Sequence, residues 1–116
     1  MLPKKHRLRR QRDFRETLKS GRTLKEKFLI LKARNNHLGY SRFGVVVSKK
    51  VSKTAVARNR IKRVLRSVIE EEIKEGATAK NIDAVLIALP GIKDEEAKEI
   101  RNAASDLFKK IKTLKL

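Results

Sequence analysis

The feature that most restricts the fold is a long amphipathic segment at residues 55–75. Its apolar residues recur with the 3.6-residue period of an α-helix, at Ile61, Val64, Leu65, Val68, Ile69 and Ile73. A β-branched run, Phe43–Val47, precedes the segment, and an apolar run at residues 82–89 follows it and ends at Pro90. A helix between two such strands must bury its apolar face on their sheet, so the pattern predicts helices packed on a sheet.

The remaining elements are shorter or weaker. They are expected at residues 13–20 (helix), 22–24 (short edge strand), 28–31 (strand) and 93–113 (amphipathic helix). Gly21 ends the first helix, and Asp94–Glu96 are expected in the first turn of the last one, where the helix dipole favours acids.

The predicted order is therefore α-β-β-β-α-β-α, which belongs to the α+β class as a two-layer α–β sandwich. With 116 residues the chain is expected to form a single domain, residues 1–116. Residues 1–8 are expected to be a flexible basic N-terminus.

Charge is the strongest signal of composition. Thirty-one Lys and Arg against thirteen Asp and Glu give a net charge of +18. Such an excess destabilises a compact chain by self-repulsion, so a polyanionic partner is expected. Nucleic acid is the first candidate and an anionic membrane surface is the rival. No apolar run reaches the roughly 18 residues of a membrane span. The absence of cysteine excludes disulfides and is compatible with a reducing, cytoplasmic location.

The segment 55–75 carries its cations on one flank. On a helical wheel, Asn59, Lys62, Arg63 and Arg66 fall together between about 100° and 200° from Ile61. Arg58 and Arg60 lie in the first turn, and no acid follows until Glu70. Solvated helix faces normally mix both signs, so this one-signed flank predicts a surface that binds a polyanion.

Residues that could carry catalysis are scarce. Ser48 adjoins Lys49, but no third group orients such a pair, so contact with phosphate is the simpler interpretation. His6 and His37 have no ligand spacing, and no acids are arranged as a metal-dependent nuclease requires. We therefore predict no catalytic and no metal-binding residue in this chain.

Several blocks resemble the signature of the bacterial ribonuclease P protein subunit. The specific ones are Val47-Ser-Lys-Lys-Val51 and Ala57-Arg-Asn-Arg-Ile-Lys-Arg63 with Arg66. Weaker matches are Arg7-Leu-Arg9, Asp13-Phe14, Gly21-Arg22 and Asp83-Ala-Val-Leu-Ile87. The resemblance covers roughly residues 6–90, and the last helix fits in position and type.

The resemblance implies a strand–helix–strand crossover of left-handed sense, opposite to the general rule. It implies that the chain belongs to a ribonucleoprotein endoribonuclease whose partners are ribonuclease P RNA and precursor tRNA, with no membrane or protein partner. The RNA would hold the catalytic Mg²⁺ ions, and the protein would bind the 5′ leader that the complex removes.

Carried over residue by residue, the resemblance also implies site residues. The RNA-binding set is Lys49, Lys50, Lys53, Arg58, Asn59, Arg60, Lys62, Arg63, Arg66, Arg9, Arg10 and Arg12. The cleft for the leader would include Phe14, Leu18, Leu31 and Phe28. Phe14 is equally consistent with a core position.

Two departures from the family pattern stand out. Leu18 and Leu31 occupy positions where the family often has aromatic residues, so stacking on the leader is expected to be weaker or to use Phe28 or Tyr40. The linker 51–57 is one residue longer than in many members, which leaves the geometry of that loop open.

Two other functions share the charge and size. A structural RNA-binding protein, such as a small ribosomal protein, would also lack catalytic residues. A DNA-binding module would place side chains that read base edges in a groove. The cationic flank holds phosphate-type side chains with Asn59 as its one amide, which disfavours sequence reading.

Overall fold

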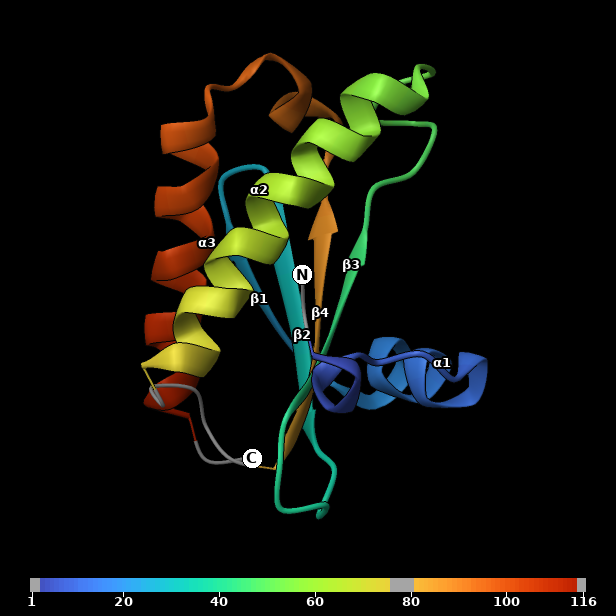
Figure 1. Cartoon of the computed structure of the whole chain (residues 1–116), viewed down its shortest axis with the longest axis vertical. Coiled ribbons are helices and arrows are strands. Elements are labelled where there is room, and N and C mark those ends of the chain that lie inside the picture. The colour runs from blue at the N-terminus through green and yellow to red at the C-terminus, as the bar shows by residue number, and fades with distance from the viewer. Residues whose placement is uncertain (1–2, 76–80, 115–116) are drawn as a thin grey trace.

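The computed structural model describes residues 3–75 and 81–114. Within them, three α-helices and one four-stranded sheet follow the predicted order (Figure 1). The elements are α1 Gln11–Ser20, β1 Arg22–Glu26, β2 Leu29–Asn35, β3 Arg42–Val46, α2 Ala55–Lys74, β4 Ile82–Ala88 and α3 Ala97–Lys112, with short 3₁₀ turns at Lys4–His6 (η1) and Pro90–Asp94 (η2). The α+β class and the order α-β-β-β-α-β-α are confirmed.

The sheet has the strand order β1-β2-β4-β3, in which β3 and β4 are parallel and the other neighbours are antiparallel. Helix α2 connects the two parallel strands. In Figure 1, α2 lies in front of the sheet, both strands point upward, and β4 lies to the left of β3. This is the left-handed crossover that the family resemblance implied, against the usual hand of such units.

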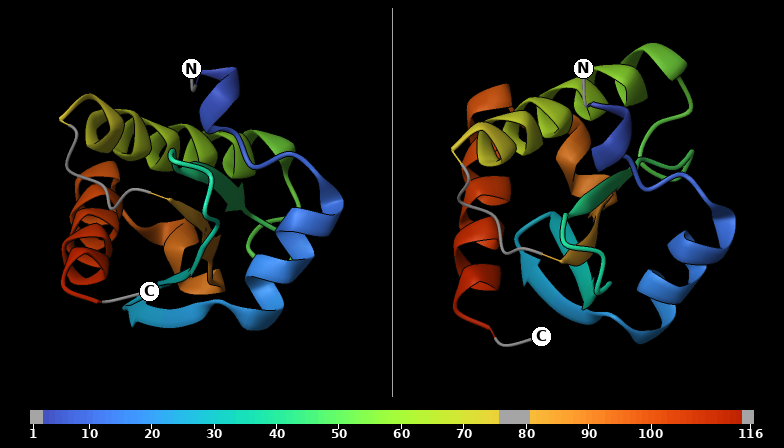
Figure 2. Two further views of the ribbon diagram at one scale, coloured as in Figure 1. Left: turned by 90° about the horizontal axis from the view of Figure 1, so that it is seen from below. Right: turned by 60° about the horizontal axis from the view of Figure 1, so that its bottom comes forward.

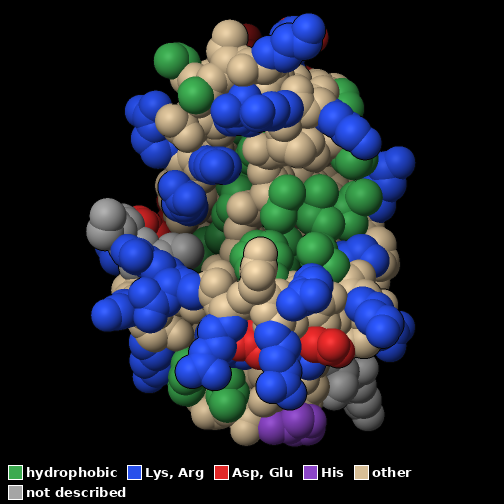
Figure 3. Space-filling view, turned by 90° about the vertical axis from the view of Figure 1, so that its right-hand side faces the viewer, with side chains coloured by type: hydrophobic (Ala, Val, Ile, Leu, Met, Phe, Trp, Pro, Cys, Tyr) green, Lys and Arg blue, Asp and Glu red, His purple; other side chains and the backbone are tan. Residues whose placement is uncertain are grey.

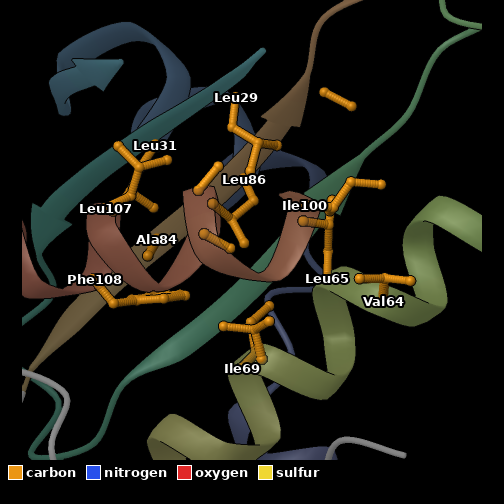
Figure 4. Packing of buried hydrophobic residues seen from close by; sticks show 14 of the residues in the cluster. Leu29, Leu31, Val64, Leu65, Ile69, Ala84, Leu86, Ile100, Leu107 and Phe108 are labelled. Carbon is orange, nitrogen blue, oxygen red and sulfur yellow. The ribbon is translucent and has the colours of Figure 1, made fainter. Parts of the chain in front are cut away.

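One face of the sheet forms the hydrophobic core with α2 and α3. Alternation along β2 sends Leu29, Leu31 and Ala33 to this face, and each is fully buried. Phe43 of β3 meets Phe108 of α3 edge to face, with ring centroids 6.0 Å apart. Figure 4 shows side chains from both helices turned toward the strands. The core is mainly aliphatic, so sheet and two helices form the α–β sandwich.

Helix α2 agrees with the predicted segment 55–75. Thr54 caps its start, because its hydroxyl oxygen accepts a hydrogen bond from the N–H of Ala57 at 3.4 Å. The helix ends at Lys74, one residue before the predicted end; Gly76, which follows the predicted segment in the sequence, lies outside the described residues. Neither α2 nor any other helix of the described chain is both long and apolar enough to cross a membrane.

Three sequence predictions need correction. The last helix begins at Ala97 rather than at residue 93, because Pro90 starts a 3₁₀ turn whose Ile92 is fully buried. Residues 94–96 therefore precede the helix instead of forming its first turn. Glu72 lies among the apolar positions of α2 and is buried, with its carboxylate 3.1 Å from Lys112 Nζ. The strand predicted at 28–31 extends to Asn35.

We expect Leu65→Ala to lower the free energy of unfolding by about 2–5 kcal/mol, since Leu65 is fully buried against the sheet and truncation leaves a cavity. Val56→Ala is the matched control on the same helix, because Val56 is 79% exposed. Chemical denaturation measures both. Equal stability of the two variants would show that Leu65 is not part of the core.

Candidate nucleic-acid interface

Helix α1 lies on the opposite face of the sheet from α2 and α3 (Figure 2). Side chains alternate between the two faces along each strand, so the strand residues that alternate with the core residues point toward α1. Three of them form a charged row across the sheet, because Arg34 of β2 and Arg42 of β3 both pair in register with Asp83 of β4. Asp83 is fully buried, so its charge requires partners within the protein.

Asp83 receives hydrogen bonds from three side chains. Arg42 donates from Nε at 2.8 Å and from Nη2 at 2.7 Å, which is the bidentate geometry that orients a guanidinium most firmly. Asn36 donates at 2.8 Å and Arg34 at 3.4 Å. The hydrogen bond to Asp83 raises the pKa of Arg42 above its ordinary value.

The same arginines hold α1 against the sheet. Arg42 Nη1 donates to Asp13 of α1 at 3.1 Å, and Arg34 Nε donates to the buried Thr17 hydroxyl at 3.3 Å. At the next residue of α1, the C=O of Leu18 accepts a hydrogen bond from Lys32 Nζ at 2.9 Å. Thr17 is the one fully buried residue among those of α1, so polar contacts rather than an apolar face fix the position of this helix.

A cleft of about 670 Å³ opens between residues 7–9, α1, β3 and α2. Its apolar lining comes from Leu8, Phe14, Phe43, Gly44 and Val45, and its polar lining from Arg7, Arg9, Arg63, Arg66, Ser67 and Glu70. The ring of Phe14 rests on Gly44 so closely that a Cβ at residue 44 would lie 2.6 Å from two ring atoms. The cleft can therefore exist in this form only with glycine at that position.

The segment before α1 forms one wall of the cleft. Leu8 is buried, and its N–H donates to the C=O of Phe43 at 2.9 Å. His6 Nδ1 lies 2.7 Å from the C=O of Ser41. Figure 2 shows the segment passing between α2 and α1. Residues 6 and 8 therefore have defined contacts with β3 and the residue before it. The flexibility expected of residues 1–8 stays a prediction.

Beside the cleft, α1 leaves part of the sheet uncovered. Ile30, Ile87 and Val46 pair in register across β2, β4 and β3, and all three are partly exposed on the face that α1 occupies. Figure 3 shows an apolar area on this side of the molecule, framed by Lys and Arg side chains. Sequence analysis missed these residues, although the two-residue alternation of the strands was the signal that could have identified them.

The predicted cleft residues separate into two groups. Phe14 lines the cleft, and Leu18 lies partly exposed one turn further on α1. Leu31 and Phe28 lie in the hydrophobic core, so the prediction that they line the cleft is wrong. Leu31 alternates with Ile30 and points to the opposite face, toward α3. Tyr40 also lies outside the cleft, beside Lys5 and His6.

The predicted RNA-binding residues surround the cleft on two sides. On α2, Arg63 and Arg66 line it, and Asn59 is exposed on the same flank. Arg58 turns back and donates to the C=O of Ser52 at 2.9 Å and of Lys53 at 3.0 Å. Arg60 Nη2 donates to the C=O of Lys93 at 3.4 Å. These two arginines thus also support local structure.

Of the other predicted cations, Lys62 of α2 is partly buried and the rest are exposed. Lys49, Lys50 and Lys53 lie in the loop before α2, and Arg9, Arg10 and Arg12 lie at the start of α1. The loop, whose geometry the sequence left open, turns at Ser48, where the N–H of Val51 donates to the Ser48 C=O at 3.0 Å. Ser52 then supports Thr54, whose N–H donates to the Ser52 hydroxyl at 3.3 Å.

The fold and this surface define a small basic α+β protein with cations on both sides of an apolar cleft, a type of surface suited to single-stranded polyanions. The family model for ribonuclease P matches residues 2–112. The ribonuclease P protein component of Alkaliphilus metalliredigens is 37% identical over 109 residues, covering 94% of this chain and 96% of the relative. That of Syntrophomonas wolfei is 41% identical over 92 residues, covering 79% and 75%. The chain belongs to the ribonuclease P protein family.

Solved structures agree with this assignment. The ribonuclease P protein of Thermotoga maritima superposes with a TM-score of 0.79 at 30% identity, covering 90% of this chain and 96% of that one. The Staphylococcus aureus protein gives a TM-score of 0.79 at 28% identity, covering 93% and 95%. Both share the fold described above.

We expect Asp83→Asn to lower the free energy of unfolding by about 3–5 kcal/mol, because the amide cannot compensate the charge of Arg42 and its NH₂ group would face the guanidinium. Asp106→Asn, at an exposed position of α3, is the control for loss of one carboxylate. Thermal melting compares the two, and matching melting temperatures would contradict the role given to Asp83.

We expect Gly44→Ala to lower the free energy of unfolding by about 1–3 kcal/mol, because the new methyl group would displace the Phe14 ring. In a Phe14→Ala background the same change should cost little, since the ring is then absent. A double-mutant cycle measures this difference. Additive effects of the two substitutions would show that Phe14 and residue 44 are not in contact in solution.

Proposed function

We propose that this chain is the protein component of ribonuclease P and that it binds the ribonuclease P RNA and the 5′ leader of precursor tRNA. The observation that carries the proposal is the apolar cleft with arginines on both walls, in a chain that belongs to this family. Such a cleft holds a single strand by contacting phosphates at its rim and bases or sugars on its floor. We also place its activity in the cytoplasm.

The leader is assigned to the face that α1 leaves open. Phe14 offers a ring on which one base can stack, worth about 1–3 kcal/mol. The row Ile30, Ile87 and Val46 offers further apolar surface without aromatic rings. We therefore propose that leader binding depends on general apolar contact and on phosphate contacts more than on stacking of several bases.

The catalytic RNA is assigned to the exposed cations of α2 and its preceding loop. Arg63 and Arg66 lie at the cleft, and Lys49, Lys50 and Lys53 extend the positive surface toward the start of the helix. These side chains suit phosphates rather than base edges, as expected for a protein that recognises a folded RNA by its backbone. A purely structural RNA-binding protein would use the same contacts, so activity must separate the two functions.

No step of the cleavage reaction is assigned to this chain. In the proposal, Mg²⁺ would be held mainly by the RNA and would supply the metal-ion chemistry of the cleavage. Within the described residues, no three His, Asp or Glu side chains gather where they could hold a metal ion. The role of the protein is then to hold the leader and the RNA in the geometry that the reaction needs.

Reconstitution tests the proposal directly. The chain is mixed with a bacterial ribonuclease P RNA at low Mg²⁺, and cleavage of a precursor tRNA is followed. We expect cleavage at the mature 5′ end that depends on the protein. Tight binding to the RNA without stimulated cleavage would instead support a structural RNA-binding protein.

We expect the double variant Arg63→Ala with Arg66→Ala to weaken RNA binding and to leave the melting temperature unchanged, because both side chains are exposed. Loss of two phosphate contacts should reduce the slope of log K against log salt by about 1.4–1.8. Lys98→Ala with Lys109→Ala on α3 removes the same charge from an exposed surface remote from the cleft and serves as the control. An equal effect of both pairs would mean that net charge alone governs binding.

A further inference from the structure

A second hollow, of about 360 Å³, lies on the other side of the N-terminal segment from the cleft. Tyr40 is its aromatic lining residue. The other described residues that line it are all cationic: Lys4, Lys5, Arg7, Arg9, Arg10 and Arg42. Tyr40, Lys4 and Lys5 belong neither to the family signature nor to helix α2, and the function proposed above gives these three residues no role.

The two hollows share a wall. Arg7 and Arg9 line both of them, and Leu8 between these arginines is buried with its backbone bonded to β3. Successive side chains on an extended segment point to opposite sides, so burial of Leu8 directs its two neighbours outward. A single strand in the cleft can therefore pass across this segment while its phosphates stay close to a guanidinium.

The charges of the second hollow favour a polyanion. Arg42 is already paired with Asp83 and Asp13, and the described lining of the hollow includes no Asp or Glu. Repulsion among the cationic side chains that line it is a cost of folding that bound phosphates would relieve. A small counterion could relieve the same cost, but it would make no use of the aromatic ring at the same place.

Tyr40 supplies that second element. Lys5 Nζ lies 5.1 Å from the centre of its ring, and the His6 ring meets it edge-on with centroids 6.4 Å apart. These contacts hold the ring in the hollow beside the cations. An aromatic ring next to several cations is the combination that binds a nucleotide, whose base or sugar packs on the ring while its phosphate meets the charges.

We propose that the second hollow binds nucleotides of the 5′ leader that extend beyond the cleft, so that longer leaders gain contacts with Lys4, Lys5 and Tyr40. This inference rests on the proposed function. The leader is preferred over the catalytic RNA as occupant because the hollow adjoins the cleft, with Arg7 and Arg9 lining both, whereas no residue of α2 is among those that line the hollow.

The test varies leader length with the reconstituted holoenzyme. Precursor tRNAs with leaders of about two and about twelve nucleotides are compared, spanning the site sizes of single-strand binding surfaces. Lys4→Ala with Lys5→Ala should weaken binding of the long-leader precursor about fivefold, as expected for loss of two exposed ionic contacts. Binding of the short-leader precursor and affinity for ribonuclease P RNA alone should not change.

Tyr40→Leu keeps an apolar side chain and should give a similar loss that is also confined to the long leader. The control is Lys98→Ala with Lys109→Ala, which removes the same charge from α3 and should affect both precursors equally. Melting temperatures verify that each variant is folded.

Three results would overturn the inference, and each has a distinct meaning. Equal losses for both leaders would show that the hollow does not contact the leader. Weaker affinity for ribonuclease P RNA alone would assign the hollow to that RNA. If the unaltered protein stimulates no cleavage of either precursor, the proposed function fails and this inference fails with it.

Discussion

The buried carboxylate of Asp83 is the interaction on which the functional face depends. It lies near the start of the inner strand β4, and its partners Arg42 and Arg34 are the residues that bind Asp13 and Thr17 of α1. Helix α1 buries little apolar surface, so without these bonds nothing would fix its angle to the strands. The shape of the cleft therefore follows from a charged row in the sheet rather than from the hydrophobic core.

The two faces of the sheet consequently carry different tasks. The face against α2 and α3 holds the aliphatic core and supplies most of the stability, as the complete burial of Leu65 and Leu86 indicates. The face toward α1 is only partly covered, and there the protein concentrates cations and leaves apolar side chains accessible. Because stability is provided on one side, the other side can tolerate the repulsion that a net charge of +18 creates.

Much of the fold was predictable from periodicity, whereas the site was predictable only in part. The 3.6-residue pattern identified α2 and its cationic flank, and β-branched runs identified the strands. The left-handed sense of the crossover from β3 through α2 to β4 was implied only by the family resemblance, because local sequence patterns carry no information about handedness. Leu31 was misplaced because a strand with apolar residues on both faces, such as Leu29–Leu31, does not reveal which face is covered. Asp83 stood in the sequence as an isolated acid, and its role depends on a register that brings Arg34 and Arg42 beside it.

The aliphatic row Ile30, Ile87 and Val46 has a consequence for recognition. An aromatic ring stacks on the face of one base, whereas branched aliphatic side chains offer surface that accepts any base or sugar equally. In the proposed complex, the cations around this row contact phosphates, which every nucleotide carries. Both kinds of contact are independent of sequence, and this suits a protein whose proposed substrate is a set of leaders that differ in sequence but share the chemistry of a single RNA strand.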